Sequence, residues 1–212
     1  MSGTSQEAIV LHRDNVEKYW DEKHTAMDPA YLSSGTIDGL ARCFTGSDIC
    51  ATVKSARTVL DIGPGLGRVL GELPDSVAKY AVEVSPAGRA RLAAEGVTCF
   101  SPYDEPRALE ADVAWCVSVI QHCDDAVFAR TLEWAGTALR EGGRFYLQGV
   151  LDDAVATDAD RLAAGRFSHA APIALAGKHG LELIAQNSPR QVPAVPQMRY
   201  WTAWYRKWTA QY

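Results

Sequence analysis

The sequence predicts an α/β domain built on a doubly wound, mostly parallel sheet with an antiparallel hairpin at its C-terminal end. Short apolar runs alternate with longer helical patterns from Arg57 onward. A glycine-rich loop follows the first run, and the last two runs have no helix between them. The 212 residues and a hydrophobic content of 47% suit one domain with a sizeable core.

Seven apolar runs are the expected strands. Three helical patterns, RVLGELPDSV, SPAGRARLAAEG and AVFARTLEWAGTALREGG, lie between the first five, which is typical of strand-helix-strand units and parallel pairing. These five runs are RTVLDI (57–62), KYAVEV (79–84), VTCF (97–100), DVAWCV (112–117) and RFYLQGV (144–150). The last two, LELIAQ (181–186) and RYWTAWYRKW (199–208), are joined by a segment without a helical pattern. We therefore expect them to pair as an antiparallel hairpin at a sheet edge.

Residues 1–52 are expected to form a helical cap on a core of residues 53–212. One helix is predicted within SQEAIVLHRDNVEKYWDEKH and a second around TIDGLARCF. No repeat, low-complexity tract or linker separates the two parts, so both are assigned to a single domain.

Composition and charge argue against several partners. The formal net charge is -5 and like charges form no long run, so a nucleic-acid backbone would meet no broad basic field. The five cysteines form no C-x-x-C pair, which favours free thiols in a reducing cytoplasm. The first residues lack the basic region and apolar core of a secretory leader, and no apolar stretch is long enough to cross a membrane, so we expect a soluble protein that is neither secreted nor membrane-spanning. The choice between monomer and homodimer is open.

The stretch VLDIGPGLG, residues 59–67, predicts a strand, a tight loop and the start of a helix. Its glycines let the backbone approach a ligand closely, and the free N–H groups of the following helix favour an electron-rich group. A dinucleotide fingerprint would need a glycine where Arg68 stands. Glu83 ends the next strand, twenty positions after Gly63, where a carboxylate can accept hydrogen bonds from ribose hydroxyls. An adenosine without a pyrophosphate fits this arrangement.

Four motifs in this order resemble those of class I methyltransferases that use S-adenosylmethionine, in the small-molecule branch related to the ubiquinone and menaquinone methyltransferases. They are VLDIGPGLG, AVEV, DVAWCVSVIQH and LREGGRF. The resemblance covers Val59 to about Val150 and, less fully, the final hairpin. It implies a Rossmann-like sheet of seven strands, with an antiparallel strand inserted between the fifth and the sixth. It also implies S-adenosylmethionine as cofactor and S-adenosylhomocysteine as product.

The resemblance further assigns parts of the cofactor to particular residues. Asp61 and the glycine loop would hold the methionine portion, with its amine near the backbone of Val117, and Glu83 would take the ribose hydroxyls. Asp104 or Tyr103 would meet the adenine amino group. The whole expected set is Asp61, Gly63, Gly65, Gly67, Glu83, Tyr103, Asp104, Val117 and, from the cap, Tyr19.

Three side chains are candidates for a general base. His122 follows the fourth strand, where ligands bind in open sheets, and a histidine is largely neutral near physiological pH. The alternative for His122 is packing or a place at the cofactor's edge. On a helix, Asp21 and His24 share a face with Trp20 and could look into one cleft, unless the helix packs as an amphipathic cap. His169 is expected at the surface. The sequence HCDD has no further metal ligands beside it, so no metal site is predicted.

The expected reaction moves a methyl group onto an oxygen or nitrogen of a small-molecule acceptor, mainly by positioning the two reactants. A hydroxyl acceptor would need a base at His122, His24 or Asp21, whereas an amine could lose its proton elsewhere. Two other classes stay open: an enzyme like the aminopropyl-transferring synthases, and a non-catalytic module that binds S-adenosylmethionine. A protein or RNA methyltransferase is disfavoured by the acidic charge and by V-S-V-I in place of an N-P-P-Y motif.

Overall fold

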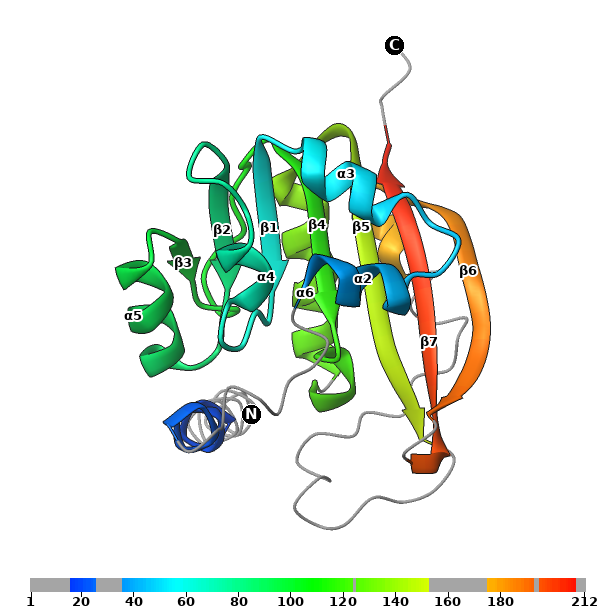
Figure 1. The fold of residues 1–212 in the computed structure, drawn as a ribbon, viewed down its shortest axis with the longest axis horizontal. Coiled ribbons are helices and arrows are strands. Elements are labelled where there is room, and N and C mark those ends of the chain that lie inside the picture. Colours follow the sequence, from blue (N-terminus) through cyan, green and yellow to red (C-terminus); the bar gives the residue numbers. More distant parts are fainter. Residues whose placement is uncertain (1–15, 26–35, 124, 153–174, 193–194, 209–212) are drawn as a thin grey trace, which may run out of the picture.

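A seven-stranded sheet forms the centre of the computed structural model, which describes residues 16–25, 36–123, 125–152, 175–192 and 195–208. The strands lie in the order β3-β2-β1-β4-β5-β7-β6 (Figure 1). Their bounds are β1 Thr58–Ile62, β2 Ala78–Val82, β3 Thr98–Phe100, β4 Ala111–Val117, β5 Leu139–Asp152, β6 Leu181–Val192 and β7 Val195–Lys207. The predicted α/β fold with a doubly wound sheet is confirmed.

Strand β7 is antiparallel to both of its neighbours. Tyr205 on β7 lies opposite Phe145 on β5 and opposite Leu183 on β6, whereas all other pairs in the sheet are parallel. This confirms the antiparallel strand inserted between the fifth and sixth strands. The hairpin is longer than the two apolar runs, because both strands continue into the segment that joins them.

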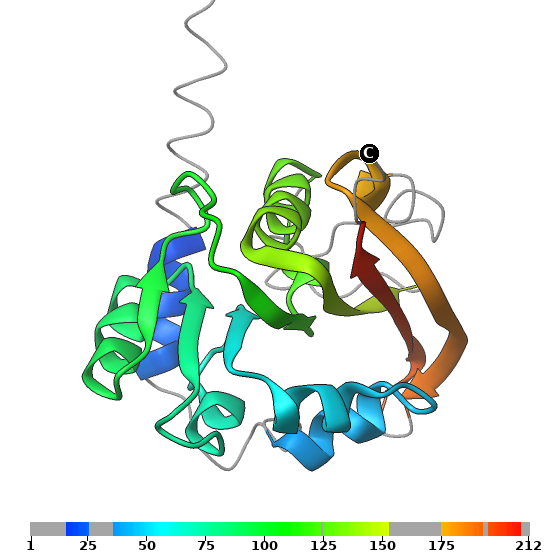
Figure 2. The same cartoon turned by 90° about the horizontal axis from the view of Figure 1, so that it is seen from above.

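Helices cover both faces of the sheet (Figure 2). Helices α2 and α3 pack on one face, where Leu40 and Val53 share a core with Tyr146 and Trp204. Helix α6 packs on the opposite face, where Trp134 joins the second core. The bounds are α2 Ile37–Cys43, α3 Ile49–Ser55, α4 Arg68–Gly71, α5 Pro86–Ala94, the short 3-10 helix η2 Ile120–His122 and α6 Asp125–Ala138. Residues 16–25 are also helical.

Helix α3 was not predicted from the sequence. It has seven residues, and its buried side chains are Ile49 and Val53, so its apolar pattern is too short to stand out. It forms because the sheet face beside it offers apolar partners, which is the usual source of stability for a short helix. The assignment of residues 1–52 to a cap and 53–212 to the core stays a prediction.

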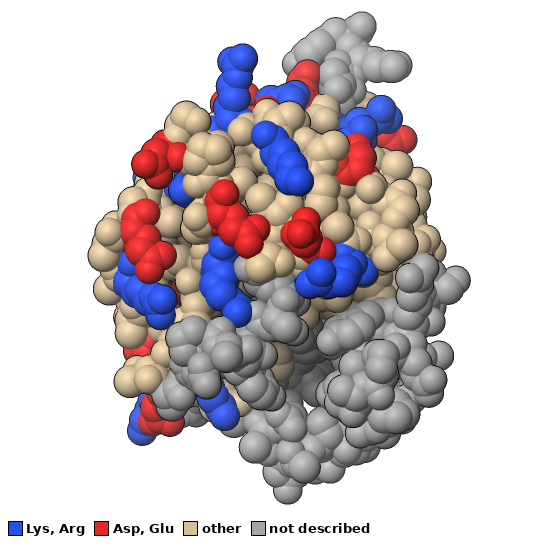
Figure 3. Space-filling view, in the orientation of Figure 1, with Lys and Arg blue, Asp and Glu red and all other residues tan. Residues whose placement is uncertain are grey.

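The surface carries both signs of charge. On the face shown in Figure 3, acidic and basic side chains of the described residues are interspersed rather than gathered into one basic field. Within the described ranges, no helix is both long and apolar enough to cross a membrane.

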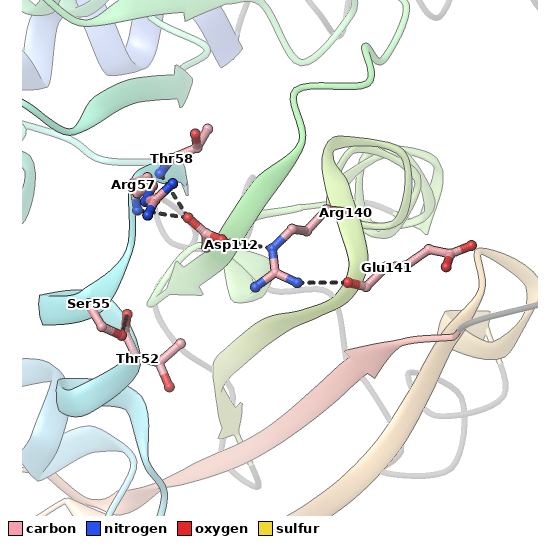
Figure 4. A network of polar contacts seen from close by, with 7 residues as sticks. All are labelled: Thr52, Ser55, Arg57, Thr58, Asp112, Arg140 and Glu141. Atoms are coloured by element: carbon pink, nitrogen blue, oxygen red, sulfur yellow. Dashed lines mark hydrogen bonds and ion pairs between the residues drawn. The ribbon is translucent and has the colours of Figure 1, made fainter.

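The amino ends of β1, β4 and β5 are held together by one carboxylate, that of Asp112 (Figure 4). It accepts hydrogen bonds from the backbone N–H groups of Arg57 and Thr58 at 2.7 and 3.1 Å, and from Arg140 Nε at 2.7 Å. Burial by itself would raise the pKa of Asp112, but these hydrogen bonds outweigh it and hold the pKa below its usual value. This network lies at the opposite end of β1 and β4 from their carboxyl ends.

Replacing Asp112 by alanine is expected to lower the free energy of unfolding by about 2 kcal/mol, because two backbone N–H groups and a guanidinium lose their acceptor. The pKa of this carboxyl is lower in the folded than in the unfolded chain. Its contribution is therefore present at neutral pH and is lost as pH falls through the folded pKa. Urea denaturation of both proteins at pH 7 and near pH 3 measures the effect.

The matched control is Glu182→Ala. Glu182 pairs with Arg206 at 2.7 Å, and both side chains are half exposed, so its loss should change the free energy of unfolding by less than about 0.5 kcal/mol. Equal losses in the two variants would contradict the role given to Asp112.

Candidate functional site

The expected site residues gather at the carboxyl ends of β1, β2 and β4. Helix α5 and the helical segment 16–25 lie beside each other next to this edge (Figures 1 and 2). Ligands of open α/β sheets bind at such an edge, where the loops leave neighbouring strands in different directions.

The three glycines of the loop after β1 all have a positive φ but meet different surroundings. A Cβ on Gly63 would lie 2.3 Å from Val119 Cγ2, and one on Gly67 would lie 2.3 Å from Leu92 Cδ2. Both positions therefore need glycine for packing inside the protein. A Cβ on Gly65 would meet nothing within 4 Å, so this part of the loop borders open space. Gly65 is where a ligand can approach the loop backbone.

Two carboxyl groups are buried beside this loop. Asp61, in β1, is 5% exposed, and Glu83, just after β2, is 3% exposed. Burial raises the pKa of Asp61 to about 8, against a hydrogen bond from Trp115, and the nearby Glu83 carboxylate adds to the rise. Burial also raises the pKa of Glu83, to about 7. Perturbed carboxyls at the edge of a sheet are typical of a ligand site.

The Glu83 carboxylate ties the loops after β1 and β2 together. Its Oε1 accepts a hydrogen bond from the backbone N–H of Ser85 at 2.8 Å, and it is also hydrogen-bonded by the backbone of Gly65 and Val84. Arg89 Nη1 donates to the backbone oxygens of Glu83 and Val84 at 2.7 and 2.8 Å. The carboxylate is thus fixed in position at the edge of the glycine loop.

The helical segment 16–25 docks on the start of α5 through Asp21. The Asp21 carboxylate accepts a hydrogen bond from the Ser85 hydroxyl and another from the Ala87 N–H at 3.2 Å. Ser85 is also the N-cap of α5, where its hydroxyl oxygen accepts from the Gly88 N–H at 2.9 Å. A carboxylate is favourable at the start of a helix. Asp21 therefore stabilises α5 from outside that helix.

Replacing Asp21 by alanine is expected to release segment 16–25 from α5, because the Ser85 hydroxyl and the Ala87 N–H lose their shared acceptor. Trypsin should then cleave after Lys18 and Lys23 at least about tenfold faster than in the unchanged protein. The neighbouring Glu22 is exposed, so Glu22→Ala is the matched control and should leave cleavage unchanged. Equal cleavage rates in the two variants would argue against this docking.

Aromatic rings of the same segment reach the end of β4. The Trp20 ring lies edge-on to the His122 ring, with centroids 5.2 Å apart, and is 5.9 Å from the His24 ring. The Tyr19 ring contacts Trp20 with centroids 5.3 Å apart. Burial lowers the pKa of His24, although Asp21 opposes the shift, so His24 is neutral at physiological pH. His122 and segment 16–25 therefore border the same region.

The loop after β3 holds the expected adenine residues. Asp104 is exposed, and its Oδ2 accepts a hydrogen bond from the Ser101 N–H at 2.8 Å. Tyr103 is half-buried, and its backbone N–H donates to Ser101 Oγ at 3.3 Å. Asp104 thus accepts a hydrogen bond within its own loop.

The sequence predicted most of the side chains at the carboxyl edge of the sheet, but not Ser85, Ser118 and Val119, which hold these side chains in place. Ser85 was readable as a helix cap, since it precedes Pro86, but its bond to Asp21 joins residues far apart in sequence. Val119 and Ser118 carried no sequence signal. The predicted His169 lies outside the described residues.

A family model described as a methyltransferase domain matches residues 28–188 of the chain. No curated protein matches the chain. Among solved structures, the 1,6-didemethyltoxoflavin-N1-methyltransferase of Burkholderia thailandensis, with 1,6-didemethyltoxoflavin and S-adenosylhomocysteine bound, is 21% identical with a TM-score of 0.64. That match covers 99% of this chain and 92% of the other.

Two further structures are similar at lower identity. The N-methyltransferase NodS of Bradyrhizobium japonicum WM9, in complex with S-adenosylhomocysteine, is 14% identical, with a TM-score of 0.65 over 91% of this chain and 98% of that one. The geranyl diphosphate C-methyltransferase of Streptomyces coelicolor A3(2) is 11% identical, with a TM-score of 0.62 over 92% of this chain and 97% of that one. At such identities the likeness shows a shared fold.

Proposed function

Because the chain belongs to the family of class I methyltransferase domains that use S-adenosylmethionine, we propose that it methylates an oxygen or nitrogen atom of a small molecule. The observation that carries the proposal is the buried Glu83 carboxylate, hydrogen-bonded to the glycine loop beside the open space at Gly65. A carboxylate fixed in this way can accept hydrogen bonds from two neighbouring hydroxyls.

The residues present fit the cofactor. Glu83 would accept hydrogen bonds from the ribose hydroxyls, and Asp61 would face the ammonium group of the methionine portion, close to the backbone of Val117. Tyr103 or Asp104 would meet the adenine. Two buried carboxyls whose pKa values are raised by burial suit a cationic ligand, because a positive charge beside them offsets that burial.

Bound S-adenosylmethionine supplies an electrophilic methyl group on a sulfonium. The chain then has to orient the acceptor and exclude water. We propose that segment 16–25 contributes to both, as the part of the expected cap that docks on α5 and contacts His122. His122 is the preferred candidate base, because Asp21 is committed to the start of α5. His24 is neutral and can also accept a proton.

Two observations support a small-molecule acceptor. The net charge is -5, and the described face in Figure 3 has no basic field that would attract a nucleic acid. The similar structures from Burkholderia thailandensis and Bradyrhizobium japonicum are named as methyltransferases, and the first was solved with 1,6-didemethyltoxoflavin bound.

Calorimetry with S-adenosylmethionine, S-adenosylhomocysteine and NAD tests the cofactor assignment. Binding of the first two at about micromolar affinity, and no binding of NAD, is expected. A panel of small phenols, alcohols and amines, followed by release of S-adenosylhomocysteine, then tests transfer. Binding without turnover on any acceptor would favour the non-catalytic module. Release of methylthioadenosine, with decarboxylated S-adenosylmethionine as donor and an amine as acceptor, would favour an aminopropyl-transferring enzyme.

His122→Gln separates the two kinds of acceptor. With a hydroxyl acceptor, the variant is expected to lower kcat about 100-fold, because the base that takes the proton is lost. With an amine acceptor kcat should change little. In both cases S-adenosylhomocysteine should bind as before, and a loss of binding would show that His122 holds the cofactor instead. His179→Gln, in the turn before β6, is the matched control and should leave kcat unchanged.

A further inference from the structure

Ser118 has a left-handed backbone at the point where β4 ends. Its φ is +58°, and in the part of the chain that the structure describes Glu110 is the other non-glycine residue with a positive φ. A residue with a Cβ is disfavoured in this conformation, whereas glycine adopts it freely. The turn therefore depends on a contact that offsets the strain.

Gln148 on β5 supplies that contact twice. The Ser118 hydroxyl donates to Gln148 Oε1 at 2.9 Å, and the Ser118 N–H donates to the Gln148 backbone oxygen at 3.3 Å. Gln148 is 3% exposed and lies opposite Val117 in the sheet. Its side chain also hydrogen-bonds the thiol of Cys43, the last residue of α2. The turn is thus anchored to a buried strand and to the helix that covers it.

The turn at Ser118 decides where the next residues lie. Val119 lies so close to Gly63 that a Cβ there would be 2.3 Å from Val119 Cγ2. Ile120 also lies close to Gly149, where a Cβ would be 2.6 Å from Ile120 Cδ1. A right-handed turn would direct the chain elsewhere and remove both side chains from the glycines that accommodate them. The same turn carries η2, with His122, to the carboxyl edge of the sheet.

We propose that Gln148 is a positioning residue for methyl transfer: it holds Ser118 in the left-handed conformation that sets Val119 against the glycine loop and brings His122 to the site. Gln148 acts through Ser118. The proposal rests on the proposed function of this site, because the glycine loop and His122 are its parts. The buried Gln148 carboxamide thereby contributes to cofactor affinity through its hydrogen bond to Ser118, and not only to packing.

Gln148→Leu tests the proposal, since leucine keeps much of the volume and removes both side-chain hydrogen bonds. We expect S-adenosylhomocysteine to bind about tenfold more weakly in calorimetry. Hydrogen exchange of the amides of residues 119–123 should become faster. Adding Ser118→Gly should restore most of the affinity, because glycine adopts the left-handed turn without help. If Gln148→Leu does not fold, Ser118→Ala tests the same bond, because alanine keeps the strain and lacks the hydroxyl.

Thr202→Val is the matched control. Thr202 lies opposite Gln148 on β7, is 4% exposed, and accepts a hydrogen bond from Asn187 Nδ2 at 3.2 Å. Its loss should lower Tm but leave both S-adenosylhomocysteine affinity and exchange of residues 119–123 unchanged.

Three results would overturn the proposal: unchanged affinity and exchange in Gln148→Leu, an equal loss of affinity in Thr202→Val, or a double variant no better than Gln148→Leu. If the unchanged protein binds no S-adenosylhomocysteine, the proposed function fails. In that case the hydrogen-exchange rates of residues 119–123 in these variants still show whether Gln148 holds the turn at Ser118, because this measurement needs no ligand.

Discussion

Replacing Glu83 by alanine is expected to weaken S-adenosylhomocysteine binding about 100-fold, because a charged acceptor for two ribose hydroxyls is lost. The variant also removes the acceptor for the backbone N–H groups of Ser85 and Gly65, so the glycine loop loses its link to β2. Calorimetric titration of S-adenosylhomocysteine into both proteins measures the effect.

Glu72→Ala is the control, because it also removes a carboxylate that accepts a hydrogen bond from a backbone N–H group. Glu72 Oε2 accepts a hydrogen bond from the Ile37 N–H at 2.7 Å, at the start of α2 and outside the glycine loop. This variant should keep its affinity for S-adenosylhomocysteine. If Glu83→Ala bound as tightly as Glu72→Ala, the ribose assignment would be wrong.

The raised pKa of Glu83 makes the same binding depend on pH. Ribose hydroxyls donate to the ionised carboxylate, so binding favours the charged form and lowers this pKa. Because the pKa without ligand is about 7, affinity should fall as pH drops below 7, by up to about tenfold per pH unit. Above that pH the part of the dependence that comes from Glu83 should level off. Titrations between pH 5.5 and pH 8.5 test this, and Glu83→Gln should remove this part of the dependence.

The sheet could be predicted because each of its strands is a short apolar run bounded by residues that end it. Pairing partners followed from connection length: long helical patterns imply parallel neighbours, and the segment after Gln186 has none. The ends of β6 and β7 could not be predicted, because pairing between the two strands continues beyond the apolar runs. Helix α3 was not predicted because its apolar pattern, with Ile49 and Val53 buried, is too short to stand out.

The sequence predicted those site residues that lie at the carboxyl ends of strands. Asp61 lies in β1 and Glu83 directly follows β2, and the parallel pairing of β1 with β2 brings the two together. The bond from Asp21 to Ser85 could not be read from the sequence, since it joins segments whose relative position depends on the whole fold. The left-handed turn at Ser118 was equally hidden, because serine carries no preference for that conformation.

Asp61 is where stability and cofactor binding oppose each other. Burial raises the pKa of this carboxyl from its ordinary value of 3.8 to about 8. Between these two values the folded chain takes up a proton that the unfolded chain does not hold. The free energy of unfolding contributed by Asp61 therefore falls as pH rises through this range. A cationic group bound beside Asp61 would favour its ionised form and lower its pKa again.

Asp61→Asn is accordingly expected to make the protein more stable and to weaken binding. Near pH 8 the free energy of unfolding should rise by about 2 kcal/mol, because the amide carries no charge that burial disfavours, and the gain should shrink toward pH 4. S-adenosylhomocysteine should bind at least about tenfold more weakly, since its ammonium group loses the opposite charge. Urea denaturation across this pH range and calorimetry measure the two effects. The exposed Asp38 gives the control Asp38→Asn, which should change neither. A variant that lost stability together with affinity would show that the Asp61 carboxylate is ionised and needed by the fold itself.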